Sequence, residues 1–92
     1  MIRYKVNESR IEEVKKIVRE FVSRVKDKEP KIIVYEVYQL AKSDAEFVHF
    51  VKFEDEQAEK IHNHTDYKKK FFNNLKGSLD GKIRYIYLNA IY

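Results

Sequence analysis

The chain of 92 residues contains no cysteine and no tryptophan, and it has only one proline and two glycines. Without cysteine it can form neither a disulfide nor a thiolate metal site. The low proline and glycine content is typical of an ordered globular protein and argues against disorder. A chain this short has room for one hydrophobic core, so we expect a single domain over residues 1–92, with oligomerisation as the remaining source of stability.

The chain also lacks a long hydrophobic run. Arg3, Lys5 and Glu8 interrupt the apolar residues near the N-terminus, and no stretch approaches the roughly 20 residues that span a membrane. We therefore expect a cytoplasmic protein with no membrane segment. Basic residues outnumber acidic ones by only 19 to 15, which gives a net charge of +4. This balance permits an anionic partner without requiring one.

Hydrophobic periodicity, by contrast, is strong in the first part of the chain. Residues 2–6 alternate apolar and polar side chains, which predicts a half-buried strand. Over residues 9–25 the apolar side chains recur at spacings of three and four, and this pattern predicts an amphipathic helix. Ser9 is expected to cap that helix, with Glu12 completing a capping box.

A β-hairpin is predicted next. Residues 31–40 and 46–54 are rich in β-branched and aromatic side chains, a composition that favours strands. Residues 41–45 form a short, mainly polar segment that is typical of a turn. The two strands should therefore pair with each other.

The last third of the chain predicts a broken helix followed by a strand. Acidic residues from Asp55 onward favour the start of a helix. The polar segment 62–66 is poor helix material, so we expect a break there, with Thr65 or Asp66 capping a second piece. After a glycine-containing turn, residues 82–92 alternate in the manner of a strand.

This order of elements predicts an α+β, ferredoxin-like βαββαβ fold, in which helices cover one face of a four-stranded antiparallel sheet. The strands predicted at 31–40, 46–54 and 82–92 are apolar on both alternating faces. A monomer would normally expose polar residues on the face that no helix covers. We therefore expect a homodimer; a monomer whose open face binds nucleic acid or a protein is the alternative.

The most distinctive residue pattern lies in the middle of the chain. It comprises the strand segments Tyr35-Glu36-Val37-Tyr38 and Phe47 to Phe53, followed by Asp55, Ala58, His62, Thr65 and Phe71. This pattern resembles the second and third strands and the following helix of the antibiotic biosynthesis monooxygenase (ABM) family. The resemblance implies two protomers packed sheet to sheet as a dimeric α/β barrel, each with a ligand cavity between its sheet and its helices.

That family includes cofactor-independent oxygenases of quinols and polyketide phenols, haem-degrading enzymes, and many proteins without a known reaction. The haem-degrading branch requires an asparagine late in the first strand, a tryptophan at the end of the third strand and a histidine on the following helix. Asn7 matches the first position and His62 or His64 the third, but Phe53 stands in place of the tryptophan. Many relatives also have a glutamate where this chain has Val51. We therefore expect neither haem degradation nor a bound cofactor.

Two histidines are the candidate catalytic residues. His62, at the expected helix break, is either a base toward a phenol or, the interpretation we favour, a partner for backbone groups that the break leaves free. His49 lies on the same side of its strand as Phe53, where the resemblance places the pocket or the subunit interface. It is either a satisfied core residue or a buried titrating group of a site. His62 and His64 lack a third ligand, so no metal site is expected.

Further residues are candidates for binding a substrate. An apolar ligand cavity needs a few polar anchors as well as aromatic walls. The residues that could supply them are Asn7, Phe53, His64, Tyr85 and Tyr87. The same side chains could equally belong to the interface between two subunits.

Three functions stay open. In the oxygenase that the resemblance implies, a small electron-rich phenol or quinol reacts with oxygen while His49 or His62 takes its proton and Asn7 or a tyrosine orients it. No nucleophile–base pair or phosphate loop supports other chemistry, so a non-catalytic small-molecule-binding or assembly dimer is the alternative. RNA binding is the least favoured, because its stacking motif needs a basic residue and a glycine where Glu46 and Phe47 stand.

Overall fold

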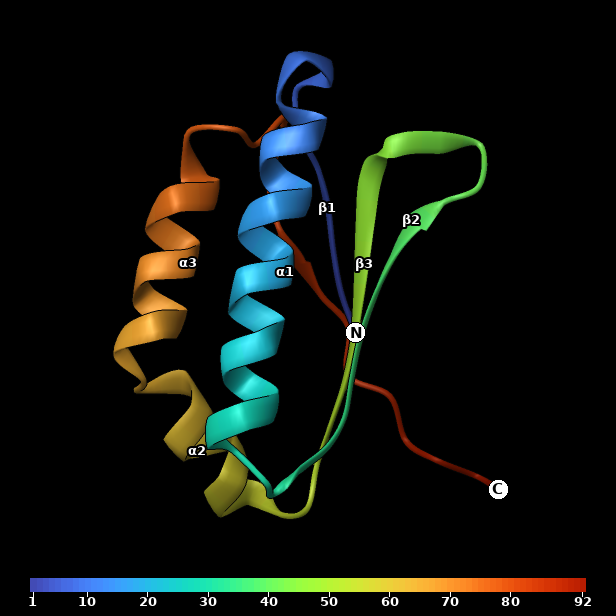
Figure 1. Ribbon diagram of the computed structural model, residues 1–92. Helices are drawn as coiled ribbons and strands as arrows, with labels where there is room; N and C mark the ends of the chain where they lie inside the picture. Colours follow the sequence, from blue (N-terminus) through green and yellow to red (C-terminus); the bar gives the residue numbers. More distant parts are fainter.

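Three helices lie against one face of a four-stranded antiparallel sheet in the computed structural model, which describes residues 1–92 (Figure 1). The strand order is β2-β3-β1-β4. This architecture confirms the predicted α+β, ferredoxin-like fold. The elements in chain order are β1 (Ile2–Lys5), the 3-10 turn η1 (Glu8–Arg10), α1 (Ile11–Lys28), β2 (Ile32–Leu40), β3 (Ser43–Phe53), α2 (Glu56–Asn63), α3 (Asp66–Lys76) and β4 (Arg84–Tyr85).

The first helix, α1, follows its hydrophobic pattern but differs from the prediction at both ends. Val14, Val18, Phe21 and Val25 form its buried face, as the spacing of three and four requires. Ser9 does not cap it, since residues 8–10 already form the tighter turn η1 and no side chain caps the N-terminus of α1. At the other end the helix continues for three residues beyond the predicted 9–25.

The predicted break in the second helical region is confirmed. The Asp55 carboxylate accepts a hydrogen bond from the backbone N–H of Ala58 at 2.8 Å and so caps α2. The Thr65 hydroxyl accepts a hydrogen bond from the backbone N–H of Lys68 and caps α3. The break between the two helices leaves His62 on the last turn of α2.

The register of the sheet brings four residues into one row across its strands. His49 of β3 is opposite Val37 of β2 on one side and Ile2 of β1 on the other. Ile2 is also opposite Tyr85 of β4. Side chains in one row point to the same face, and His49 is buried beneath the helices. The main core cluster, on this face, consists of Tyr4, Val6, Val14, Val18, Phe47 and Leu75.

The opposite face of the sheet is more polar than the sequence predicted. Tyr38 and Phe50 lie edge to face there and are 51% and 37% exposed. Arg3 and Glu46, however, form an ion pair at 3.4 Å beside them, and Glu36 is exposed opposite Phe50. The prediction that both sheet faces are apolar is therefore only half right, because charged side chains interrupt this face.

The last strand is much shorter than the predicted range 82–92. β4 ends at Tyr85, and Ile86 exchanges backbone hydrogen bonds with Met1. No strand includes residues 87–92. These residues lead away from the sheet (Figure 1). Their exposed apolar side chains include Tyr87. None of the helices is both long and apolar enough to cross a membrane.

Candidate functional site

Two histidines lie buried among aromatic rings between the sheet and the helices. The first, His49, is held by tyrosine hydroxyls at both ring nitrogens. The Tyr4 hydroxyl lies 2.7 Å from Nε2, and the Tyr35 hydroxyl lies 3.0 Å from Nδ1. A neutral imidazole has one donor and one acceptor nitrogen, so one tyrosine donates to the ring and the other accepts from it. We call Tyr4, His49 and Tyr35 the tyrosine–histidine cluster.

The tyrosine–histidine cluster is uncharged at neutral pH. Burial lowers the pKa of His49 to about 4, because an imidazolium ion is poorly solvated inside the protein. Burial likewise raises the pKa values of Tyr4 and Tyr35 far above neutrality. All three side chains therefore keep their neutral forms, and every polar atom among them has a partner.

The second histidine, His62, is paired with a carboxylate and not with backbone groups at the helix break, so the interpretation that we favoured from the sequence is wrong. Its Nδ1 lies 3.0 Å from Oε2 of Glu29, which follows the last residue of α1. The hydroxyl of Tyr67, on α3, donates to the same oxygen. Glu29 and His62 are only 8% and 4% exposed. We call Glu29, His62 and Tyr67 the carboxylate–histidine cluster.

The carboxylate fixes which nitrogen of His62 carries the proton. A carboxylate only accepts hydrogen bonds, so His62 donates from Nδ1, and Nε2 of the neutral ring keeps a free lone pair. That nitrogen takes part in none of the hydrogen bonds of the chain. Burial lowers the pKa of His62, although the bond to Glu29 opposes this effect. His62 is therefore neutral at pH 7 and able to accept a proton at Nε2.

Besides Nε2 of His62, the carboxylate–histidine cluster contains a second polar atom without a hydrogen-bond partner, and it belongs to Glu29. Its other oxygen, Oε1, is buried and has no hydrogen-bond partner. Buried polar atoms almost always have partners, and an unpaired carboxylate oxygen destabilises the folded state. The carboxylate–histidine cluster is thus a place where polar atoms are available for further interactions.

Aromatic rings surround His62 and connect it to the other cluster. The ring centroids of Phe21, Tyr35 and Phe53 lie 5.9, 6.1 and 5.6 Å from that of His62. Phe21 in turn stacks on Phe71 at 4.3 Å. Tyr35 contributes to both environments, since its hydroxyl bonds to His49 while its ring faces His62.

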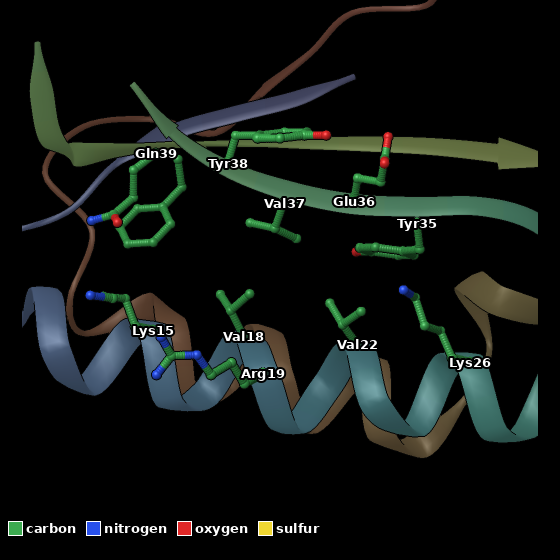
Figure 2. Close-up of a pocket in the computed structure, with 11 residues that line it drawn as sticks. Lys15, Val18, Arg19, Val22, Lys26, Tyr35, Glu36, Val37, Tyr38 and Gln39 are labelled. Carbon is green, nitrogen blue, oxygen red and sulfur yellow. The ribbon is translucent and has the colours of Figure 1, made fainter. Parts of the chain in front are cut away.

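A groove of about 490 Å³ lies between α1 and the edge strand β2 (Figure 2). Tyr35 forms part of its wall, which places the groove next to both clusters. Its floor is apolar, and basic side chains of α1 lie along its rim. The lining residues are Lys15, Val18, Arg19, Val22, Lys26, Tyr35, Glu36, Val37, Tyr38, Gln39 and Phe47.

The structure brings some of the predicted site residues together. His62 and Phe53 lie side by side, and both catalytic candidates, His49 and His62, approach Tyr35. Tyr85 lies in the sheet row of His49, two strands away across β1.

The other predicted residues lie apart from the two clusters. Asn7 is exposed at the start of η1. It lies five residues after Ile2, the β1 residue that is opposite His49. His64 is exposed, and its Nδ1 bonds to the backbone carbonyl of Lys60 at 2.7 Å. Tyr87 is 84% exposed on the C-terminal segment. No three His, Cys, Asp or Glu side chains are arranged to hold a metal ion.

Four residues of the clusters were not identified from the sequence. Tyr4 and Tyr35 occupy inward positions of strands, and a buried tyrosine usually has a hydrogen-bond partner. Their positions in the alternating strand patterns therefore indicated that each hydroxyl would need a buried partner. Glu29 lies in the charged connector 26–30 and resembles any solvated acid there. Tyr67 is similarly inconspicuous among the lysines of α3.

Comparison with known proteins places this geometry in a family. The model of the antibiotic biosynthesis monooxygenase (ABM) family matches residues 1–74. No curated protein matches the chain.

Solved structures share the whole fold at low sequence identity. An antibiotic biosynthesis monooxygenase superposes with a TM-score of 0.90 at 19% identity, covering 99% of this chain and 95% of its own. A Caulobacter crescentus CB15 protein that is provisionally named for the same activity superposes with a TM-score of 0.93 at 23% identity. The match covers 99% of this chain and 86% of the Caulobacter chain. A provisionally named counterpart from Nitrosomonas europaea gives 0.91 at 14% identity, with the same coverage. The fold and the family match together show that the chain belongs to the antibiotic biosynthesis monooxygenase family.

Proposed function

We propose that the chain is a cofactor-independent monooxygenase of a small phenol or quinol, with His62 as the base. The observation that carries this proposal is the free Nε2 of a neutral His62 whose Nδ1 proton is held by Glu29. A carboxylate behind an imidazole orients the ring and stabilises the imidazolium ion that forms when it takes a proton. The family membership supports oxygen chemistry without naming a substrate.

The chemistry proposed for His62 begins with the phenolic proton. Transfer of that proton to Nε2 leaves an electron-rich phenolate, and the positive charge on the ring is balanced by Glu29. Oxygen then bonds to a ring carbon of the substrate, and the His62 imidazolium returns its proton to the resulting peroxide. The O–O bond breaks as the proton on that ring carbon leaves, and the two fragments depart as water. Phenol and O₂ thus give quinone and H₂O. One atom of O₂ enters each product, and the substrate itself supplies the electrons.

The tyrosine–histidine cluster has a positioning role in this proposal. His49 has no free nitrogen, so it does not contact the substrate. Its bond to Tyr35 holds the tyrosine ring that lines the groove and whose centroid lies 6.1 Å from that of His62. The substrate would enter through the groove and extend past Tyr35, so that its phenolic hydroxyl reaches Nε2 of His62 beside Phe53.

Oxygen uptake with a panel of naphthols and hydroquinones tests the role of His62. We expect the wild-type protein to consume oxygen, and His62→Ala to lower kcat by about 100-fold or more, the usual contribution of a general base. Gln57→Ala, an exposed change on the same helix, is the control and should leave the rate unchanged. Equal uptake by wild type and His62→Ala would contradict the assignment.

We further propose that the protein acts as a homodimer, the state that the resemblance implies. Two surfaces support this: the sheet face that carries Tyr38 and Phe50, and the exposed apolar residues of segment 87–92. Light scattering after size exclusion would measure the mass of the full chain and of a variant that lacks residues 87–92. We expect a dimer for the full chain and a larger monomer fraction for the variant; a monomeric full chain would contradict the proposal.

The second candidate function is a dimer that binds a small molecule without transforming it. The complete hydrogen bonding of the tyrosine–histidine cluster favours this alternative, because a satisfied network supports a rigid binding wall. Saturable ligand binding without oxygen uptake for any substrate of the panel would favour this second function over the first.

A further inference from the structure

We propose that the groove between α1 and β2 selects anionic aromatic molecules, such as phenols or quinols that carry a carboxylate. The selectivity for anions does not depend on the proposed function. Only the statement that the bound molecule is a substrate rests on it. The inference deepens that function by naming the charge that the substrate should have.

The floor of the groove is suited to a planar apolar body. Val18 and Val22 of α1 face Tyr35 and Val37 of β2 across it (Figure 2). Phe47 contributes a further aromatic side chain to the lining. A volume of about 490 Å³ is within the range of small-molecule sites, which are usually mostly apolar with a few polar anchors.

The rim of the groove carries cations on one side of α1. Lys15, Arg19 and Lys26 are spaced by four and seven residues, so they lie within one face of the helix. Arg19 and Lys26 take part in none of the ion pairs of the chain. Lys15 pairs with Glu12, which is itself mostly exposed. Two of the three rim cations are therefore available to a ligand.

No acid of the lining faces these cations. Glu36 is the single carboxylate among the lining residues, and Figure 2 shows its side chain on the far side of β2 from α1. Tyr35 and Val37 point toward the helix instead. A ligand that placed its ring on the floor and a carboxylate at the rim would satisfy both kinds of surface.

A second basic hollow on the protein lacks this combination. It lies where α1 passes the start of α3 and is lined by Arg24, Lys28, His64, Thr65, Asp66, Tyr67 and Lys70. Tyr67 is its one apolar lining residue. This hollow has positive charge without an apolar floor, so it offers nothing to the ring of an aromatic anion. It provides a matched control on the same helix.

Calorimetric titration at low ionic strength with 2-naphthoate and its neutral analogue 2-naphthamide tests the inference. We expect naphthoate to bind about tenfold more tightly, since a hydrogen bond to a charged group adds roughly 1.5 kcal/mol. The double variant Arg19→Gln/Lys26→Gln should remove this preference and leave naphthamide binding unchanged. Arg24→Gln/Lys28→Gln removes the same two charges elsewhere on α1 and should preserve the preference.

Two results would overturn the inference: equal affinity of wild type for the two probes, or equal loss of naphthoate binding in both double variants. The readout does not depend on turnover. Naphthoate selectivity without oxygen uptake from any phenol would refute the oxygenase and leave the selectivity established. Oxygen uptake from neutral quinols, with no naphthoate preference, would refute the selectivity alone.

Discussion

His49 and His62 lie in the same aromatic core, yet their polar surroundings differ. Each ring nitrogen of His49 meets a tyrosine hydroxyl, and the tyrosine–histidine cluster carries no charge. His62 meets a carboxylate on one side and no hydrogen-bond partner on the other. Burial lowers the pKa of both rings, but only His62 has a nearby anion that opposes the effect.

This difference separates a structural role from a chemical one. A buried network in which every atom is paired stabilises and rigidifies the core. A buried carboxylate with an unpaired oxygen lowers stability, so a stability role does not explain Glu29. The tyrosine–histidine cluster is thus suited to holding the sheet together, and the carboxylate–histidine cluster to accepting a proton.

The largest expected effect is the loss of stability in His49→Ala. The change removes a side chain that is 1% exposed and leaves two buried tyrosine hydroxyls without partners. We expect the free energy of unfolding in urea to fall by about 3–5 kcal/mol. His64→Ala, at an exposed site, should change it by less than about 0.5 kcal/mol. A loss below about 1 kcal/mol at His49 would break the comparison.

The next effect is a loss of stability in acid that depends on His49. Its pKa is about 4 in the folded protein against 6.5 for the free side chain, so between these values the unfolded chain binds more protons. The free energy of unfolding therefore falls as the pH drops from 6.5 to 4, by about 3 kcal/mol from this group. Urea titrations of wild type and His49→Gln across this range measure the contribution, because the variant lacks the titrating ring. Parallel pH profiles for the two proteins would contradict it.

A smaller effect is expected in Glu29→Gln, which keeps a hydrogen-bond acceptor for His62 but removes the charge. Because Glu29 raises the pKa of His62 against the effect of burial, the variant should have a lower His62 pKa. NMR titration of the imidazole measures this shift, and the acid limb of any oxygen-uptake profile should move to lower pH with it. We expect kcat to fall by about tenfold as the base becomes weaker. An unchanged imidazole pKa would show that the carboxylate does not tune the ring.

The smallest effect is expected at an ion pair on the opposite face of the sheet. Arg3 and Glu46 lie 3.4 Å apart, with 42% and 26% of their side-chain surfaces exposed. Solvent screens such a pair, so Glu46→Gln should lower the free energy of unfolding by about 0.5 kcal/mol or less. If Glu46→Gln lowered the free energy of unfolding as much as His49→Ala in the same urea assay, burial would not determine the order of these stability effects.

The sequence predicted the fold well because its signals are local or periodic. The stripe of α1, the hairpin and the helix break at Thr65 all follow from spacing and capping within a few residues. The length of β4 did not, since β4 extends only as far as its pairing with β1, and that pairing joins segments far apart in the sequence. The alternation of residues 82–92 shows a strand pattern whether or not a partner strand exists.

The members of the two clusters were identified from the sequence only in part, for a similar reason. A histidine in an aromatic strand or at a helix break is visible in the sequence, so both candidates were named. Their partners come from distant segments, and the charged connector that contains Glu29 gave no sign that the carboxylate turns inward. The basic rim of the groove was equally hidden, because it appears only when β2 lies beside α1.

The separation of these partners along the chain links chemistry to the completion of folding. Glu29 and His62 are 33 residues apart, and Tyr4 and His49 are 45 apart. Contacts of such range require loop closure and form slowly compared with helical turns. A completed but partly folded chain would therefore contain every aromatic residue of the core before Glu29 orients His62. Under the proposed function, reactivity toward oxygen would then be confined to molecules in which β1 has paired with β3 and the end of α1 has met α2.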